Sequence, residues 1–181
     1  MSKIVIFLLS GKAESGKDTC AEYLLNSFGL EKPIHLSFGS RVKEVATSLG
    51  WDGKKDEKGR AMLQWLGDGV KQFNPTFWVE KTIEDIKALS KEGYTVFIIS
   101  DCRYKDEIIK IKEEFQGCVY PIRVSRPSHK SRLSEEQLKH RSECDLDDYP
   151  FEYILHNNSN LASFERNIFN LIRNIRVIHY I

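Results

Sequence analysis

The chain has 181 residues, of which 41% are hydrophobic and 29% charged, as in an ordinary globular protein of one domain. Its 27 lysines and arginines nearly balance 26 acidic residues, so charge gives no reason to expect nucleic acid or a membrane surface as partner. No apolar run approaches the roughly 20 residues of a membrane span. The start, MSKIVIFLL, is too short for a secretory signal and lacks a small-residue cleavage site, so we expect a cytoplasmic protein.

The first apolar run, residues 3–9, is rich in Ile and ends at Ser10, which predicts a buried parallel strand. Apolar side chains at helical spacing predict a helix over 17–28, stopped by Gly29. The remaining predicted elements are strand 34–38, helix 41–50, polar loop 51–59, helices 60–73 and 75–93, strand 94–100, helix 105–115, strand 118–125, strand 151–157 and helix 161–175. Because strands alternate with helices, we expect one three-layer α/β domain over 1–181, with a mostly parallel five-stranded sheet flanked by helices.

The segment 126–150 differs in composition from the rest of the chain. Basic and histidine side chains fill its first part, and acidic ones its end: Arg126, His129, Lys130, Arg132, Lys139, His140 and Arg141, then Glu143, Asp145, Asp147 and Asp148. A long polar insert between two strands is either a solvated loop or a functional lid, and the composition leaves both open. The tail 175–181 is apolar and is expected to pack on the sheet or on a partner chain, so either a monomer or a homodimer is compatible with it.

The four cysteines show neither a CxxC motif nor paired spacing: Cys20, Cys102, Cys118 and Cys144. Reduced thiols in a cytoplasm are the simplest expectation. Cys144 and His140 could belong to a zinc site, but a second ligand pair is missing from the sequence, so we predict none.

The stretch GKAESGKDT places Gly11, Gly16 and Lys17 at the spacing of a phosphate-binding loop. Glycines let successive backbone N–H groups turn around an anion, and the N-terminus of the helix that follows favours negative charge. A predicted strand enters the stretch and a predicted helix leaves it, which favours nucleotide binding over a structural glycine turn. The residues expected to bind ATP are Gly11, Lys12, Ala13, Glu14, Ser15, Gly16, Lys17, Asp18 and Thr19.

Asp18 stands where the usual pattern has Ser or Thr, whose hydroxyl binds Mg²⁺. A carboxylate is also a hard oxygen ligand, so we predict that Asp18 binds Mg²⁺ directly or through water. Thr19 could hydrogen-bond an inner phosphate. We expect Glu14 to point into solvent, the alternative being a contact with metal or acceptor.

Asp101 ends the apolar strand in VFIISDCR, at the edge of a parallel sheet where ligands bind. We predict that it orients Mg²⁺, and the alternative is a helix N-cap. Phosphoryl transfer spreads negative charge, which arginines can neutralise. The candidate arginines are Arg41, Arg60, Arg103, Arg126 and Arg132.

These motifs resemble, in the same order, those of P-loop nucleoside monophosphate kinases, specifically the phage-type deoxynucleoside monophosphate kinases and their bacterial relatives. The matching stretches are SGKAESGKDT, HLSFGSRVKEVATSLGWDGKKDEKGRAMLQWLGDGVK, NPTFWVEK, ISDCRYKDE, IRVSRP and HRSECDLDDYPFEYILHNNSNL. The resemblance covers nearly the whole chain and is most specific in the loop, where Asp after the lysine is usual. It implies a P-loop kinase fold with an acceptor-binding helical region at about 39–92 and a lid at about 126–150. Glu14 and the turn HNNSN (156–160) depart from the family pattern.

The resemblance also implies roles for particular residues. Those expected in catalysis are Lys17, Asp101, Arg103, Arg126 and Arg132; those expected to bind the acceptor are Arg41, Arg60, Gln64, Trp78 and Arg103; the metal ligands are Asp18 and Asp101. Arg126 is expected to stack on adenine, whereas Trp65 is expected in the core. Ser142 and Glu143 match the closing motif of the lid, but no role follows for them.

The activity implied is transfer of the γ-phosphoryl group of ATP, with Mg²⁺, to a (deoxy)nucleoside monophosphate. Small-molecule nucleotides are then the partners. Two alternatives stay open: a P-loop kinase of another small acceptor, such as phosphomevalonate or dephospho-coenzyme A, and a nucleotide-binding module that transfers nothing. The sequence does not identify the base or the sugar of the acceptor.

Overall fold

The computed structural model describes residues 4–28, 32–129 and 134–179, so the predicted lid arginine Arg132 lies outside the described residues. The strands are β1 (Val5–Ser10), β2 (Pro33–Leu36), β3 (Val96–Cys102), β4 (Val119–Ser125) and β5 (Tyr153–His156). The helices are α1 (Lys17–Ser27), α2 (Phe38–Ser48), α3 (Glu57–Phe73), α4 (Phe77–Lys91), α5 (Lys105–Glu114), α6 (Glu135–Lys139), α7 (Arg141–Cys144) and α8 (Leu161–His179).

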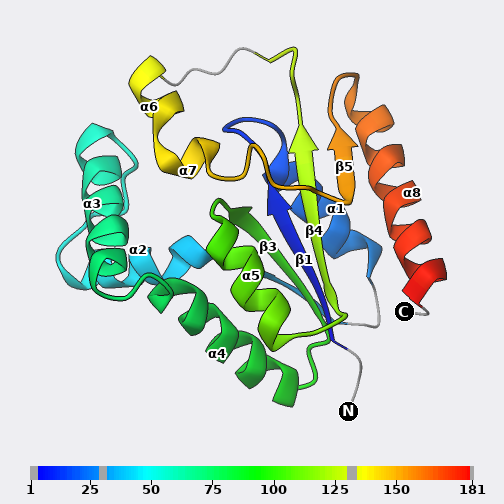
Figure 1. Cartoon of the computed structure of the whole chain (residues 1–181), viewed down its shortest axis with the longest axis horizontal. Helices are drawn as coiled ribbons and strands as arrows, with labels where there is room; N and C mark the ends of the chain where they lie inside the picture. Colours follow the sequence, from blue (N-terminus) through cyan, green and yellow to red (C-terminus); the bar gives the residue numbers. More distant parts are fainter. Residues whose placement is uncertain (1–3, 29–31, 130–133, 180–181) are drawn as a thin grey trace.

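The five strands form one parallel sheet in the order β2-β3-β1-β4-β5 (Figure 1). The predicted five-stranded sheet flanked by helices is therefore confirmed. β1 lies at the centre, between β3 and β4, so the chain leaves it toward one edge of the sheet first and the other edge later. In parallel sheets, ligands bind at the carboxyl ends of strands where the order reverses in this way. The loop after β1 occupies that position.

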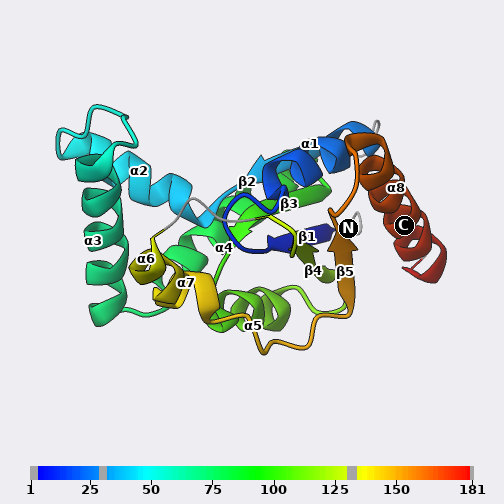
Figure 2. The same ribbon diagram turned by 90° about the horizontal axis from the view of Figure 1, so that it is seen from above.

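Helices cover both faces of the sheet, α1 and α8 on one side and α4 and α5 on the other (Figure 2). Successive side chains of β1 alternate between the two cores: Phe7 and Leu9 pack toward α1 and α8, and Ile6 and Leu8 toward α4 and α5. All four are fully buried. Burying one such side chain contributes about 1.5–3 kcal/mol, so β1 anchors the loop that follows it to the most rigid part of the molecule.

Residues 134–150 are more regular than the sequence suggested. Ser134 caps the N-terminus of α6, where its Oγ accepts a hydrogen bond from the N–H of Gln137 at 3.2 Å. α7 follows and lies beside the loop between β1 and α1 (Figure 1). Leu146 is only 3% exposed and joins the core next to α4 and α5. The described end of this segment is thus packed against the domain.

Two helices start earlier than the sequence suggested because acidic side chains cap them. α2 begins at Phe38 rather than at residue 41, since the carboxylate of Asp101 accepts hydrogen bonds from its first N–H groups. α3 begins at Glu57 rather than at residue 60, since Asp56 Oδ1 accepts from the N–H of Gly59 at 2.8 Å.

The prediction that Trp65 lies in the core is wrong, because its side chain is 71% exposed on α3. The expected apolar tail belongs to α8, which continues to His179, and Ile175 is fully buried against the α1 side of the sheet. The described cysteines are all free. Within the described ranges, no helix is long and apolar enough to cross a membrane.

Candidate active site

The loop between β1 and α1 has the backbone shape of an anion cradle. Glu14 and Gly16 adopt positive φ angles of 60° and 101°, which turn the chain sharply before α1. A Cβ atom on Gly11 would lie 2.4 Å from the carbonyl oxygen of Val124, so only glycine fits there. The amine of Lys17 reaches back over the loop and donates to the carbonyl oxygens of Gly11 and Lys12, each at 2.8 Å.

Two polar groups of the loop are suited to receive an anion. Burial, and to a lesser degree the charge of nearby Arg103, lower the pKa of Lys17 to about 8. A negative ligand would favour the charged amine and reverse that effect. The hydroxyl of Ser15 is buried and has no hydrogen-bond partner among the described residues. The phosphate groups of a nucleotide fit both groups.

A cavity of about 370 Å³ opens beside the loop. Its walls include Asp18 and Thr19 from α1, Arg126 after β4, and Asn157 after β5. Asn157 Nδ2 donates to the carbonyl of Ser15 at 3.0 Å, which ties the β5–α8 turn to the loop. The carboxylate of Asp18 is exposed at this cavity, so it is accessible to a metal ion. The cavity is where the nucleotide expected from the sequence would extend from the loop.

Glu14 is exposed and lines the same cavity, and its carboxylate lies 3.0 Å from the ring nitrogen Nε2 of His129 rather than in solvent alone. Within the described ranges, no group of three or more His, Cys, Asp or Glu residues could hold a metal ion by itself. A Mg²⁺ ion at this loop would therefore depend on few protein ligands and on the phosphates, as Mg²⁺ sites with nucleotides commonly do.

The carboxylate of Asp101 fastens the start of α2 to the end of β3. It accepts hydrogen bonds from Ser37 Oγ at 2.8 Å, from the N–H of Phe38 at 2.8 Å and from the N–H of Gly39 at 2.9 Å. Asp101 is therefore a helix N-cap, as the predicted alternative had it, but it caps α2, which is distant in the sequence, and not α5, which follows it in the chain. The bonds leave limited room for a metal ion on the same carboxylate.

Sequence reasoning missed a buried ion pair behind Arg103. Glu107 accepts hydrogen bonds from the N–H groups of Arg103 at 2.8 Å and Tyr104 at 3.1 Å, and Lys71 Nζ lies 3.6 Å from its other oxygen. Burial raises the pKa of Glu107 to about 7. Lys71 also lies 3.4 Å from the centre of the Tyr104 ring. The acidic N3 position of α5 was the available signal, because that position often caps a helix.

The acceptor-side residues expected from the sequence do not gather at one point. Arg41 is paired with Asp85 of α4 through its Nε at 3.1 Å. Arg60 is exposed, and its Nε donates to the carbonyl of Lys55 at 2.9 Å. Trp78 is buried, and its indole N–H donates to the carbonyl of Gly67 at 3.0 Å.

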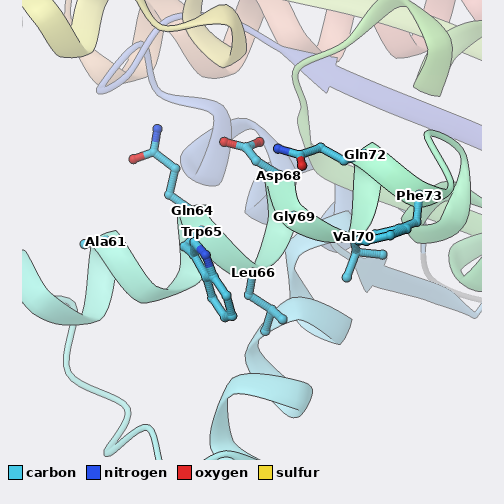
Figure 3. A pocket seen from close by; sticks show the side chains of 9 residues that line it. All are labelled: Ala61, Gln64, Trp65, Leu66, Asp68, Gly69, Val70, Gln72 and Phe73. Carbon is cyan, nitrogen blue, oxygen red and sulfur yellow. The ribbon is translucent and has the colours of Figure 1, made fainter.

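One face of α3 carries polar side chains. Gln64, Asp68 and Gln72 project to the same side of the helix, whereas Trp65 and Leu66 project to the other (Figure 3). The polar row faces α6 and α7, because Asp68 Oδ2 lies 3.5 Å from the ring nitrogen Nε2 of His140. α3 and the described end of the segment 126–150 therefore approach each other through polar groups.

Sequence reasoning also missed Arg123, which lies near the carboxyl end of β4 beside the loop. Its guanidinium donates to Ser10 Oγ at 3.2 Å and to Asp147 Oδ1 at 2.8 Å. A basic residue near the carboxyl end of a central strand was the signal for it. The structure thus brings Lys17, Arg103 and Arg123 to one site, since Arg123 contacts Ser10 at the start of the loop and Arg103 is joined to Ala13 of the loop through Glu143.

Comparisons with known proteins place this geometry in a family. The family model of phosphomevalonate kinase matches residues 9–117, more than half of the chain. The phosphomevalonate kinase of Drosophila melanogaster is 30% identical over 177 residues, which cover 89% of this chain and 91% of that protein. An uncharacterized protein of Ictalurid herpesvirus 1 (strain Auburn) is 32% identical over 158 residues, and this chain spans 65% of its length.

A solved structure confirms the fold. Dephospho-CoA kinase from Campylobacter jejuni superposes with a TM-score of 0.54 at 18% identity, covering 94% of this chain and 96% of that one. The predicted P-loop kinase fold is confirmed, whereas the deoxynucleoside monophosphate kinase type is not distinguished by these matches. The chain belongs to the phosphomevalonate kinase family and has the P-loop kinase fold.

Proposed function

We propose that the protein transfers the γ-phosphoryl group of ATP to the phosphate of a (deoxy)nucleoside monophosphate. The observation that carries the choice of acceptor is the row of Gln64, Asp68 and Gln72 on α3, which faces α6 and α7 (Figure 3). Amide and carboxylate groups offer both donors and acceptors, as the edge of a nucleobase requires. A phosphate loop at one end and a hydrogen-bonding row at the other suit an acceptor with a phosphate and a base.

Phosphomevalonate is the second candidate acceptor, and the family match together with the Drosophila relative favours it. This molecule carries a carboxylate as well as a phosphate. The negative charge of Asp68 on the α3 row would repel that carboxylate, whereas the nearby positive charges of Lys71 and Arg141 would offset part of the repulsion. Charge on α3 is therefore the property that separates the two candidates.

The proposed mechanism relies on positioning and charge. The loop N–H groups and Lys17 would hold the ATP phosphates, and Arg126, which lines the cavity beside the loop, would stack on adenine. Arg103 and Arg123 would neutralise the charge that spreads over the moving group. The acceptor phosphate is itself the nucleophile, so alignment takes the place of a protein base.

Mg²⁺ would neutralise the ATP phosphates, and we propose Asp18 as its protein ligand because its carboxylate is exposed at the cavity. Asp101 would contribute only through the lone pairs that its bonds to α2 leave free. We also propose that the segment 126–150 acts as a lid that excludes water during transfer. Its described end already contacts the loop and α3.

An acceptor panel tests the proposal. Purified protein is incubated with ATP and Mg²⁺ and with each NMP, each dNMP, phosphomevalonate or dephospho-coenzyme A, and the products are separated by anion exchange. We expect nucleoside diphosphates. A phosphomevalonate product alone would establish the second candidate. ATP binding without any product across the panel would instead identify a non-catalytic nucleotide-binding module.

A charge change on α3 sharpens the choice. Asp68→Asn is expected to lower kcat/KM for the preferred nucleotide by about tenfold or more, because an amide NH2 replaces one carboxylate oxygen and cannot accept a hydrogen bond donated by the base. If phosphomevalonate is the acceptor, the same variant raises kcat/KM, since a repulsive charge is removed. Glu84→Gln, an exposed change on α4, is the matched control.

Asp18 can be tested separately. Asp18→Asn is expected to raise the Mg²⁺ concentration needed for half-maximal rate, because an amide is a weaker ligand for Mg²⁺ than a carboxylate. Glu22→Gln, exposed on the same helix, controls for the loss of one charge near the phosphates. An unchanged Mg²⁺ requirement in Asp18→Asn would remove Asp18 from the metal site.

A further inference from the structure

The segment from Ser142 to Asp147 contacts the phosphate loop through a buried carboxylate, that of Glu143. The side chain of Glu143 is only 7% exposed. Its Oε2 accepts a hydrogen bond from the N–H of Ala13 in the loop at 3.1 Å, and its Oε1 is ion-paired with Arg103. The same arm of Arg103 also donates to the carbonyl of Ser142 at 3.3 Å. One carboxylate therefore joins the loop backbone to an arginine from the end of β3.

Asp147, four residues further along the chain, binds two other cations near the loop. Its Oδ1 accepts from Arg123 at 2.8 Å, and its Oδ2 lies 2.5 Å from the amine of Lys12. Lys12 also donates to the carbonyl oxygen of Glu143. Three cations around the loop, Lys12, Arg103 and Arg123, are thus bound by the one short segment from Ser142 to Asp147.

The contacts of Glu143 and Asp147 with these cations lie near Lys17 of the loop. The charges of Arg103, Glu143 and Arg123 all act on the pKa of Lys17, which places them within electrostatic reach of its amine. A guanidinium has five donors in a rigid plane. Arg103 uses one arm on Glu143 and Ser142, so the orientation of the remaining donors is set by that contact.

Burying a carboxylate beside a guanidinium contributes little net stability, because desolvation offsets much of the attraction. In this site the ion pair instead fixes the orientation of the Arg103 guanidinium. Arg103 is half-buried with 31% of its side chain exposed, and Glu143 holds it on the side of the loop rather than toward solvent. An arginine that neutralises a moving phosphoryl group needs that restraint, because a displacement of about 1 Å can cost about 100-fold in rate.

We propose that Glu143 is a positioning residue for phosphoryl transfer: it aims Arg103 at the phosphate loop and acts only through that arginine. Asp147 has the corresponding role for Arg123 and Lys12. The inference rests on the proposed phosphotransferase activity but not on the identity of the acceptor. The same contacts would have the opposite effect if the carboxylate merely blocked an anion site, so the sign of the change in rate is decisive.

The test compares kcat and KM of Glu143→Gln with those of the wild type. Gln keeps an acceptor for Ala13 but loses the ion pair, so we expect kcat to fall about 10- to 100-fold with little change in the KM for ATP. Glu143→Asp, which restores the charge on a shorter side chain, is expected to recover part of the rate. Asp147→Asn is expected to lower kcat, whereas its exposed neighbour Asp148→Asn is the matched control.

A double-mutant cycle separates positioning from a purely structural role. If Glu143 acts through Arg103, adding Glu143→Gln to Arg103→Gln lowers kcat little further. Additive losses would overturn the inference, and so would an unchanged kcat in Glu143→Gln. A higher kcat with tighter ATP binding would show that the carboxylate blocks the site instead. Thermal melting of each variant identifies any loss of rate that comes from unfolding.

The assay also separates this inference from the proposed function. ATP hydrolysis by water is measured beside the acceptor panel, since it needs no acceptor. If no acceptor reacts but ATP is hydrolysed, the proposed function fails, and Glu143→Gln must still slow hydrolysis for the inference to stand. Equal hydrolysis by wild type and variant would overturn the inference, and a wild type that hydrolyses no ATP and phosphorylates no acceptor would overturn both.

Discussion

Replacing Gly16 by alanine perturbs the loop at its tightest point. Gly16 has φ 101°, a conformation that side-chain-bearing residues adopt at a cost of about 1–3 kcal/mol. An added Cβ would also lie 2.5 Å from Asn157 Nδ2, which donates to the carbonyl of Ser15 at 3.0 Å. Displacing Asn157 removes that hydrogen bond, worth about 1 kcal/mol.

Together these effects predict a loss of about 2–4 kcal/mol in the free energy of unfolding of Gly16→Ala. For a chain of this length, each kcal/mol lowers Tm by about 2–4 °C, so a decrease of about 4–16 °C is expected. Differential scanning calorimetry measures the decrease, and titration with ATP measures the accompanying loss of affinity, because the loop N–H groups no longer converge on the phosphates.

Asn157→Ala is the matched variant, since it removes the hydrogen bond without straining the backbone. Its expected decrease in Tm is about 2–4 °C. In the double variant Gly16→Ala/Asn157→Ala the Cβ no longer meets the amide, so the combined loss should be smaller than the sum of the single losses. A Gly16→Ala protein as stable as the wild type, or strictly additive losses, would refute the reasoning.

Two further predictions concern protons. Because burial lowers the pKa of Lys17 to about 8, the affinity for ATP should fall as pH rises through 8 and the amine loses its charge. Lys17→Arg should remove this pH dependence. Isothermal titration calorimetry between pH 6.5 and 9 measures both affinities. Burial raises the pKa of Glu107 from its ordinary value of 4.5 to about 7, so its contribution to stability is present at low pH and is lost as pH rises through 7. The difference in Tm between wild type and Glu107→Gln should therefore change between pH 5 and 7.5. A difference that stays constant over this range would contradict the raised pKa of Glu107.

Local signals were enough to predict the sheet and the loop. β1 and β3 are continuous apolar runs, and Gly11, Gly16 and Lys17 are separated by only a few residues, so strand, loop and helix could be recognised from neighbours in the chain. The two cores on opposite faces of the sheet also follow from the β1 run, because successive side chains of a strand point to opposite faces. These features depend on short-range geometry, which a sequence displays directly.

Contacts between distant residues were not predictable in the same way. Asp101 caps a helix that begins 63 residues before it, and Glu143 meets Ala13 from 130 residues away, so no local pattern reveals either contact. Trp65 was misplaced for a related reason: spacing identifies the apolar side chains of a helix but not which of them another element covers. The composition of the segment 126–150 left a solvated loop and a lid both open, and it did not reveal that the side chain of Glu143 is only 7% exposed.

The bonds that Lys17 makes within its own loop bear on how nucleotide enters. The amine already has two acceptors, the carbonyls of Gly11 and Lys12, so the loop keeps its curvature without a ligand. An arriving phosphate exchanges those acceptors for its own oxygens and leaves the backbone where it is. Such a preorganised site loses little conformational entropy on binding, so association should proceed at a rate set by diffusion and charge rather than by refolding of the loop.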